Sequence, residues 1–123
     1  MSQANKDIVR RYLDRLGERN ADGAVELIAD DATWWWVGGR TGGKADLKAT
    51  FAKIFGLTDS MKFTIVSEIA EGDRVATEAK VEYHTKDGRV LGNDVQLTVT
   101  LKNGKFQDVH EYYDMSRPPL KLP

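Results

Sequence analysis

The stretch RVATEAKVEYHTKDGRVLGNDVQLTVTLKNGK, residues 74–105, determines most of what the sequence predicts about the fold. In two segments, 75–83 and 91–101, mostly apolar residues occupy every second position, as expected of strands with one buried face. Asp87-Gly88 follows the first segment and Asn103-Gly104 follows the second, and both pairs are frequent in the turns of β-hairpins. The stretch therefore predicts antiparallel strands joined by hairpins. The inward residues would be Val75, Thr77, Ala79, Val81, Tyr83, Leu91, Asn93, Val95, Leu97, Val99 and Leu101.

The same period of two continues before and after this stretch, which extends the predicted sheet to four strands. A strand starting at Met61 would turn at residues 71–73, and a last strand would follow the Asn103-Gly104 hairpin. The inward residues of these two strands would be Met61, Phe63, Ile65, Ile69, Val109, Glu111, Tyr113 and Met115. The opposite face is polar but rich in strand-forming residues, and it is a candidate dimer surface. Its members are Glu78, Lys80, Glu82, Gln96, Thr98 and Thr100.

Helical spacing of apolar residues distinguishes the first part of the chain from the sheet. The pattern predicts three helices: one carrying Ile8, Val9, Tyr12, Leu13 and Leu16; a short one capped by Asn20 or Asp22 that continues to Ile28 and ends at Asp30 and Asp31; and one carrying Leu47, Phe51, Ile54 and Phe55 that stops at Gly56. The predicted fold class is therefore α+β. A curved antiparallel sheet, mixed at its edge, would form a conical barrel that the three N-terminal helices close, with a pocket at the open end.

The composition fits one globular domain over residues 1–123, with a loose tail at 116–123. Lys and Arg number 18 against 19 Asp and Glu, so the formal net charge is -1, which argues against a dedicated binder of nucleic acid or anionic membranes. There is no cysteine, which excludes disulfides and thiolate chemistry. No apolar run approaches the roughly 18 residues of a membrane span, and the polar start does not resemble a secretion signal. These features predict a cytoplasmic protein without a cofactor.

All three tryptophans are consecutive, at positions 34–36. On a strand, Trp34 and Trp36 would share one face while Trp35 points to the other. Trp34 and Trp36 could therefore wall a pocket, since pockets are lined mainly by apolar and aromatic groups, or they could fill the cavity as core. Trp35 would pack outside, under a helix or a neighbouring subunit.

A glycine-rich loop follows the tryptophans, and residues 38–44 have the spacing G-x-x-x-x-G-K of a phosphate-binding loop. Ala45 stands where such a loop needs Ser or Thr for the magnesium ion. The chain also lacks the alternating strands and helices of a parallel nucleotide-binding sheet. A simple connector is therefore favoured over a nucleotide site.

Glu111 is the candidate catalytic residue, because it shares the inward face with Val109 and Tyr113. Burial destabilises a carboxylate anion and raises its pKa, as a general acid or base near neutral pH requires. Asn93 and Tyr12 could offer polar groups to the same space. Alternatively, Glu111 could bond a helix end or reach solvent at the mouth of the cone. His84 and His110 lack a spaced set of carboxylates, so no metal site is predicted.

The segments DDATWWW, GGKADLKATFAKIF, EGDRVATEAKVEYHTKDGRV and NGKFQDVHEYYDM, in this order, resemble the SnoaL-like branch of the nuclear-transport-factor-2-like superfamily over nearly the whole chain. The resemblance implies a conical α+β fold with a deep pocket and frequent homodimers. The superfamily includes polyketide cyclases, ketosteroid isomerases and limonene epoxide hydrolases.

The resemblance carries over few catalytic residues. For ketosteroid isomerase, a worked case of pKa tuning, Tyr12 matches the tyrosine, but the base falls on Trp36 and the protonated Asp near Leu97. For limonene epoxide hydrolase, Glu111 matches one Asp. The Arg and the other Asp fall on Ala79 and Val81, and the water-holding Tyr and Asn fall on Trp34 and Trp36, so that water-activating network is missing.

Three hypotheses follow from the sequence. The first is a cofactor-free isomerase, cyclase or hydrolase of a hydrophobic, ring-containing small molecule, resembling a polyketide, steroid or terpenoid. The second is a non-catalytic binding or carrier module, and the third is a structural dimer whose cavity is filled. In the first, Glu111 and Tyr12 are catalytic, and the ligand contacts are Trp34, Trp36, Asn93, Tyr113, Phe55 and Val95.

Overall fold

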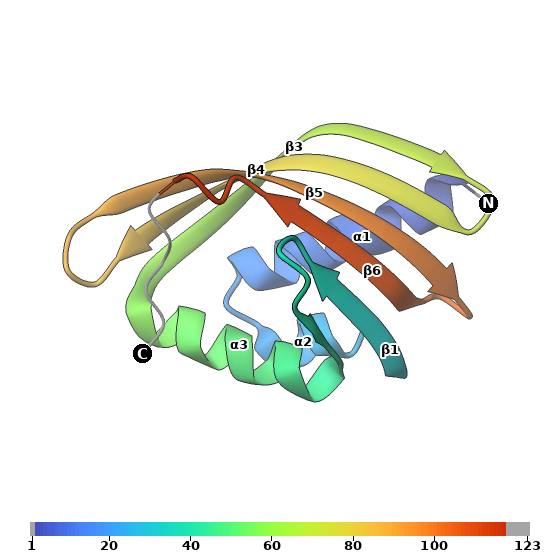
Figure 1. Ribbon diagram of the computed structural model, residues 1–123, viewed down its shortest axis with the longest axis horizontal. Helices are drawn as coiled ribbons and strands as arrows, with labels where there is room; N and C mark the ends of the chain where they lie inside the picture. The colour runs from blue at the N-terminus through green and yellow to red at the C-terminus, as the bar shows by residue number, and fades with distance from the viewer. Residues whose placement is uncertain (1, 118–123) are drawn as a thin grey trace.

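A computed structural model describes residues 2–117 and shows a curved six-stranded sheet with three helices on its concave side (Figure 1). The strand order is β2-β1-β6-β5-β4-β3. The elements are α1 (Ser2–Gly17), α2 (Ala21–Val25), β1 (Ile28–Trp36), β2 (Thr41–Gly42), α3 (Lys44–Leu57), β3 (Thr58–Glu71), β4 (Arg74–Thr85), β5 (Val90–Lys102) and β6 (Lys105–Tyr113). The predicted α+β class with three N-terminal helices is confirmed.

The two predicted hairpins join β4 to β5 and β5 to β6. Asn103 and Gly104 form a two-residue loop with φ values of 54° and 76°, and Lys102 pairs with Lys105 across it. Two consecutive residues with positive φ are what a type I′ turn requires, and Asn-Gly accepts them at the lowest cost. In the loop between β4 and β5, Gly88 has a φ of 88°.

The sheet is mixed at one edge, as predicted, because β1 pairs parallel to β6 while the other neighbours are antiparallel. It has six strands, two more than the period-two pattern alone indicates, since the tryptophan strand and the short β2 join it. The sheet is curved but not closed into a barrel: β2 and β3 are its two edges, and the helices complete the cone beneath it (Figure 1).

The second helix is shorter than predicted. Asn20 caps it, accepting a 2.8 Å hydrogen bond from the Gly23 amide, but the helix ends at Val25. Ile28 already belongs to β1 and pairs with Phe106, so Asp30 and Asp31 lie inside a strand rather than at a helix end. The prediction is wrong here because pairing with a distant strand outweighs the local helical pattern.

The junction between α3 and β3 also differs from the prediction. The helix continues through Gly56 to Leu57, and the strand begins directly at Thr58 instead of Met61. The predicted stop at Gly56 assumed a left-handed cap, whereas Gly56 is not among the glycines with positive φ. Thr58 is fully buried and its hydroxyl donates to the Ile54 carbonyl at 2.8 Å, which secures the turn from helix to strand.

The inward placement of Ile69 is wrong: this side chain is 69% exposed on the outer face. The pairing of β3 with β4 shifts between Ile65 and Ser67, and such a bulge reverses the faces of all later residues. Glu68 consequently points inward, where its side chain is 2% exposed and binds Arg10 of α1.

A second bulge adds a core residue that simple alternation does not predict. Thr100 pairs with Asp108 but Leu101 pairs with Phe106, so Gln107 is the extra residue on β6. Phe106 is therefore fully buried, and its ring centroid lies 4.9 Å from that of Tyr12. The aromatic cluster around it positions the deepest part of the cavity.

Two sequence predictions concern what lies outside the sheet and helices. No helix within residues 2–117 has the length and apolar character needed to cross a membrane. Most of the predicted loose tail, residues 118–123, lies outside the described residues.

Candidate functional site

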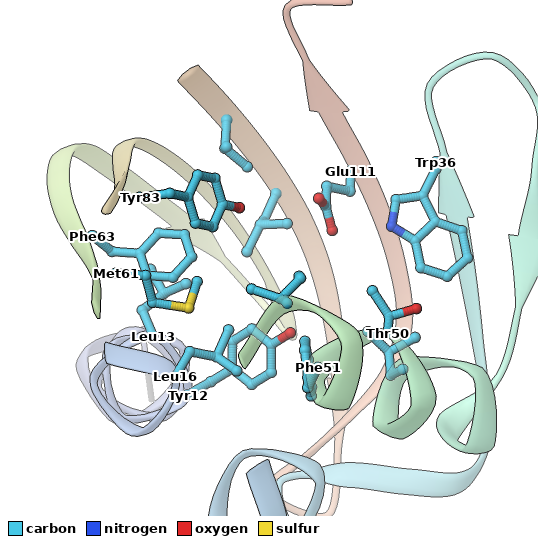
Figure 2. A pocket seen from close by; sticks show the side chains of 14 residues that line it. Tyr12, Leu13, Leu16, Trp36, Thr50, Phe51, Met61, Phe63, Tyr83 and Glu111 are labelled. Atoms are coloured by element: carbon cyan, nitrogen blue, oxygen red, sulfur yellow. The ribbon is translucent and has the colours of Figure 1, made fainter. Parts of the chain in front are cut away.

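A cavity of about 80 Å³ lies between α1, α3 and the concave face of the sheet (Figure 2). Its walls are mostly apolar and include Leu16, Leu47, Phe51, Met61 and Leu97. Three ionisable side chains interrupt this apolar lining, and these are Tyr12, Tyr83 and Glu111. The volume has room for more than one water molecule, each of which needs about 10–15 Å³.

A second cavity of about 190 Å³, the outer chamber, adjoins the first on the side of Arg40 and Tyr113. The two chambers share five lining residues, which are Trp36, Thr50, Tyr83, Val95 and Glu111. The outer chamber is further lined by Arg40, Val81, Leu91, Gly92, Asn93 and Tyr113. Even together, the two chambers fall below the range of about 300–1,000 Å³ for pockets that hold drug-sized ligands, so the site suits a smaller molecule.

Glu111 points into this cavity from β6, as its place in the strand predicts (Figure 2). One carboxylate oxygen, Oε1, accepts a 3.0 Å hydrogen bond from Nε1 of Trp34. Burial raises the pKa of Glu111, and the Trp34 indole, the Arg40 charge and the Trp36 indole each offset part of that rise. The net effect is a raised pKa, which is the direction that a general acid or base active near neutral pH requires.

The three tryptophans have three different environments. Trp34 is 2% exposed and packs among Tyr12, Trp36 and Phe106. It lines neither chamber and contacts the Glu111 carboxylate from the core side. Trp36 lines both chambers, with its indole nitrogen turned toward Glu111 (Figure 2). Of the two inward indoles, Trp36 is therefore part of the pocket wall and Trp34 is part of the core.

Trp35 lies on the outer face of the sheet, as strand alternation predicts. Its ring stacks on His110 with centroids 5.3 Å apart and contacts Tyr112 at 5.1 Å. No helix of the described chain covers this face (Figure 1).

Tyr12 and Tyr83 present their hydroxyl groups to the cavity on the side of Glu111 (Figure 2). Burial raises the pKa of both phenols, and the Glu111 charge raises it further. Both are therefore neutral donors at physiological pH. Within residues 2–117, neither hydroxyl has a hydrogen-bond partner, so both are available to a ligand.

The remaining predicted contacts divide by position. Val95 lines both chambers, and Tyr113 and Asn93 lie at the mouth. The Asn93 amide is occupied by backbone groups: Nδ2 donates to the Asp114 carbonyl at 3.1 Å, and Oδ1 accepts from the Asp114 amide at 2.9 Å. Phe55 is not among the described residues that line either chamber. The guanidinium carbon of Arg19 lies over its ring, 5.0 Å from the centroid.

The family model described as SnoaL-like domain matches residues 9–109. The chain belongs to this family. The fold and the resemblance predicted from the sequence are thereby confirmed for this SnoaL-like domain. No curated protein matches the sequence.

Solved structures similar to this SnoaL-like domain confirm its cone fold. AclR, a putative hydroxylase from Streptomyces galilaeus, has a TM-score of 0.86 at 14% identity, over 95% of this chain and 83% of its own. An epoxide hydrolase of M. tuberculosis, described as LEH-like, has a TM-score of 0.82 at 17% identity, over 94% and 86%. TerC, co-crystallised with polyporic acid, has a TM-score of 0.77 at 21% identity, over 92% and 93%. At these identities, the likeness concerns the fold alone.

Sequence reasoning missed two residues of the SnoaL-like site. The pattern predicts that Tyr83 points inward, but its proximity to Glu111 follows only when the strand order β6-β5-β4 is known. Arg40 gave no signal, since periodicity does not determine the path of a loop. Its guanidinium lies 4.3 Å from the Trp36 ring centroid.

The glycine-rich loop is a connector, as the sequence favours. Gly38 and Gly39 have φ values of 96°, and the chain reverses there to form β2 against β1. Lys44 starts α3 and binds Asp30 at 3.0 Å. Its ammonium group is therefore occupied by a carboxylate, and the sheet around the loop is not the parallel one that a nucleotide site needs.

The described residues contain no group of three His, Cys, Asp or Glu side chains placed to hold a metal ion. The site of this SnoaL-like domain instead combines one carboxylate, two neutral phenols, an aromatic wall and one cation at the mouth. This set can accept a proton, donate hydrogen bonds to an oxygen and stack on a flat ring.

Proposed function

We propose that this SnoaL-like domain binds a hydrophobic, ring-containing small molecule and catalyses proton transfer on it as an isomerase or cyclase. The observation that carries the proposal is the Glu111 carboxylate, which lines an apolar cavity together with the hydroxyl groups of Tyr12 and Tyr83. Proton transfer between carbon and a carboxylate is the step that isomerisation and aldol-type ring closure have in common.

The proposed step uses one base and two donors. Glu111 removes a proton from the carbon next to a carbonyl group. The electron pair of the C–H bond forms the C=C bond of an enolate, and the π pair of the carbonyl moves to its oxygen. Tyr12 and Tyr83 donate hydrogen bonds to that oxygen as its negative charge develops, which stabilises the transition state more than the ground state. In isomerisation, the carboxylic acid of Glu111 then returns the proton to another carbon. In ring closure, the enolate carbon attacks a second carbonyl carbon, and the proton of Glu111 passes to the alkoxide oxygen that this bond formation creates.

Trp36 supports ring binding because it lines both chambers and turns the N–H edge of its indole toward Glu111 (Figure 2). Edge-to-face contact between aromatic rings adds about 0.5–1.5 kcal/mol beyond the burial of apolar area. Hydrolysis is less well supported than proton transfer. The positions where limonene epoxide hydrolase has its Arg and second Asp hold Ala79 and Val81, which are both 3% exposed.

The test is release of deuterium from ring ketones labelled next to the carbonyl group, followed by mass spectrometry. A panel of bicyclic, steroid-like and terpenoid-like ketones makes the assay independent of the natural substrate. Because Glu111 must be ionised to act as a base, exchange should rise with pH through an apparent pKa above the ordinary value of 4.5. An apparent pKa at or below that value would contradict the proposed environment of Glu111.

A non-catalytic carrier is the alternative, and the same panel separates it from an enzyme. Titration of the ketones against tryptophan fluorescence reports binding. Saturable binding without exchange above the buffer rate at any pH would support a carrier and contradict the proton-transfer proposal. A tryptophan signal that ignores every ketone would contradict the ligand pocket itself.

We also propose that the outer face of the sheet forms a homodimer. On that face Ile69 is 69% exposed, Tyr112 is 45% exposed, and the ring of Trp35 lies between Tyr112 and His110. An exposed apolar strip of this kind is typical of an interface. Strand pairing aligns its members across the sheet in the order Trp35, His110, Thr98, Ala76, Ile69.

Introducing charge into this strip is expected to separate the subunits. Light scattering should give a dimer mass for the native chain and a monomer mass for Tyr112→Glu and Ile69→Glu, since each buries a carboxylate without a partner. Ala52→Glu on the exposed side of α3 is the matched control and should remain a dimer. A native chain of monomer mass at micromolar concentration would contradict the interface.

A further inference from the structure

Arg40 is a cation at the mouth of an otherwise apolar and acidic pocket. Among the described residues, it is the only Lys, Arg or His that lines either chamber. Within residues 2–117 no carboxylate lies within 4.0 Å of its guanidinium nitrogens, in contrast to Arg10, Arg15, Arg89 and Arg117. The guanidinium charge therefore faces the chamber without a side-chain partner from the described chain.

The backbone holds Arg40 in place. The Trp36 amide donates to the Arg40 carbonyl at 2.9 Å, and the Gly39 amide donates to the Trp36 carbonyl at 2.9 Å. Thr41, the next residue, pairs with Trp35 in the sheet. Arg40 thus belongs to a tight hairpin, and the entropy lost when it binds a ligand is smaller than for an arginine on a mobile loop.

The stacking of Arg40 on Trp36 determines which of its atoms a ligand can reach. The guanidinium carbon lies over the indole, 4.3 Å from its centroid. The N–H bonds lie in the guanidinium plane, and those that do not point at the ring are available to a ligand. A guanidinium edge is matched to a planar anion, with two parallel N–H···O bonds to a carboxylate.

Resting on the proposed function, we infer that Arg40 is a specificity residue that selects ring compounds carrying a carboxylate group. The rings would lie beside Glu111 and Trp36, which line both chambers, and the carboxylate would lie in the outer chamber against Arg40. The positive charge of Arg40, which also acts on Glu111, would offset the repulsion between the ligand anion and the Glu111 carboxylate.

The test is calorimetric titration with 2-naphthoate and its neutral methyl ester, repeated with the corresponding anthracene pair. The native chain should bind each carboxylate about tenfold more tightly than its ester at low salt. In Arg40→Gln the ratio should fall to about one, and Arg40→Lys should retain a smaller preference, since an ammonium group lacks the planar fork. Arg11→Gln, on the exposed side of α1, makes the same change of net charge and should keep the native preference.

Salt provides a second readout, because screening weakens exposed charge pairs. The preference of the native chain should shrink as the Debye length falls from about 10 Å at 0.1 M to about 3 Å at 1 M salt. Equal binding of acid and ester by the native chain, or a preference that survives in Arg40→Gln, would overturn the inference.

The inference and the proton-transfer proposal can fail separately. A carboxylate preference that depends on Arg40, with no deuterium exchange on neutral ketones, would support the Arg40 site and contradict the catalyst. Exchange without any carboxylate preference would support the catalyst and overturn the Arg40 site. If neither member of any pair binds, the Arg40 inference is overturned, and exchange on the ketones alone decides the proton-transfer proposal.

Discussion

Glu111→Gln is expected to lower the rate of deuterium exchange by about 10²–10⁴-fold, the usual contribution of a positioned acid or base. Gln has nearly the same shape as Glu, and its carbonyl oxygen can still accept the hydrogen bond that Trp34 donates to Oε1. Ketone affinity should therefore change little. Deuterium-exchange rates and fluorescence titrations of the same samples distinguish a loss of rate from a loss of binding.

Folding stability is a second measurement on this variant, because Glu111→Gln should raise stability while it lowers activity. The pKa of Glu111 is raised by burial, so the folded state binds the proton more tightly than the unfolded chain. The native chain consequently loses stability as pH rises through the interval between the two pKa values. Above this interval Glu111→Gln should unfold at a higher temperature than the native chain.

The matched control is Glu18→Gln at an exposed position directly after α1, which makes the same chemical change outside the cavity. It should leave both exchange and the pH dependence of unfolding as in the native chain. Native exchange rates in Glu111→Gln would remove the carboxylate from the mechanism, whereas a lower unfolding temperature above the interval would contradict its raised pKa.

Phe106→Ala is expected to reduce the free energy of unfolding by about 3–5 kcal/mol, the range for large aromatic-to-alanine changes in a core. Phe106 is fully buried, and its ring lies 4.9 Å from Tyr12 and 6.3 Å from Trp34. The cavity left by the ring would lie directly behind two residues of the candidate site. Urea unfolding followed by circular dichroism measures the change.

Tyr112→Ala, on the same strand but 45% exposed, is the comparison for this substitution. It removes the contact with Trp35 and should cost about 1 kcal/mol in a monomeric state, the scale of an aromatic pair. A Phe106→Ala variant no less stable than Tyr112→Ala would show that the bulge does not place Phe106 in the core.

The parts of the fold that could be predicted are those that local patterns determine. Alternation over residues 74–105 gave the strands and their faces, and Asn103-Gly104 gave a turn whose φ values require such a pair. The inward direction of Glu111 follows from the same alternation. The error at Ile69 and the absence of Phe106 from the predicted core both come from bulges, each of which inserts one residue and reverses the faces beyond it.

The site was harder to predict because its depth and its loops depend on packing. Trp34 and Trp36 share a face, but the rings of Tyr12 and Phe106 enclose only Trp34, and this difference determines which indole reaches the cavity. Arg40 lies at the mouth because the hairpin folds back on Trp36, and no period in the sequence encodes that path. Ile28 is a similar case: the local pattern predicts a helix there, but pairing with β6 makes the residue part of β1.

Three identical neighbours in β1 pose a problem of alignment, since sliding the strand by one residue would still present an indole to Glu111. The residues before the tryptophans remove this ambiguity. Ile28 and Ala32 are buried, whereas Asp31 and Thr33 are exposed, so a slid strand would carry a carboxylate and a hydroxyl into the apolar interior. Substituting apolar residues at 31 and 33 would therefore allow the strand to settle in two alternative alignments, with Trp35 in the cavity in one of them.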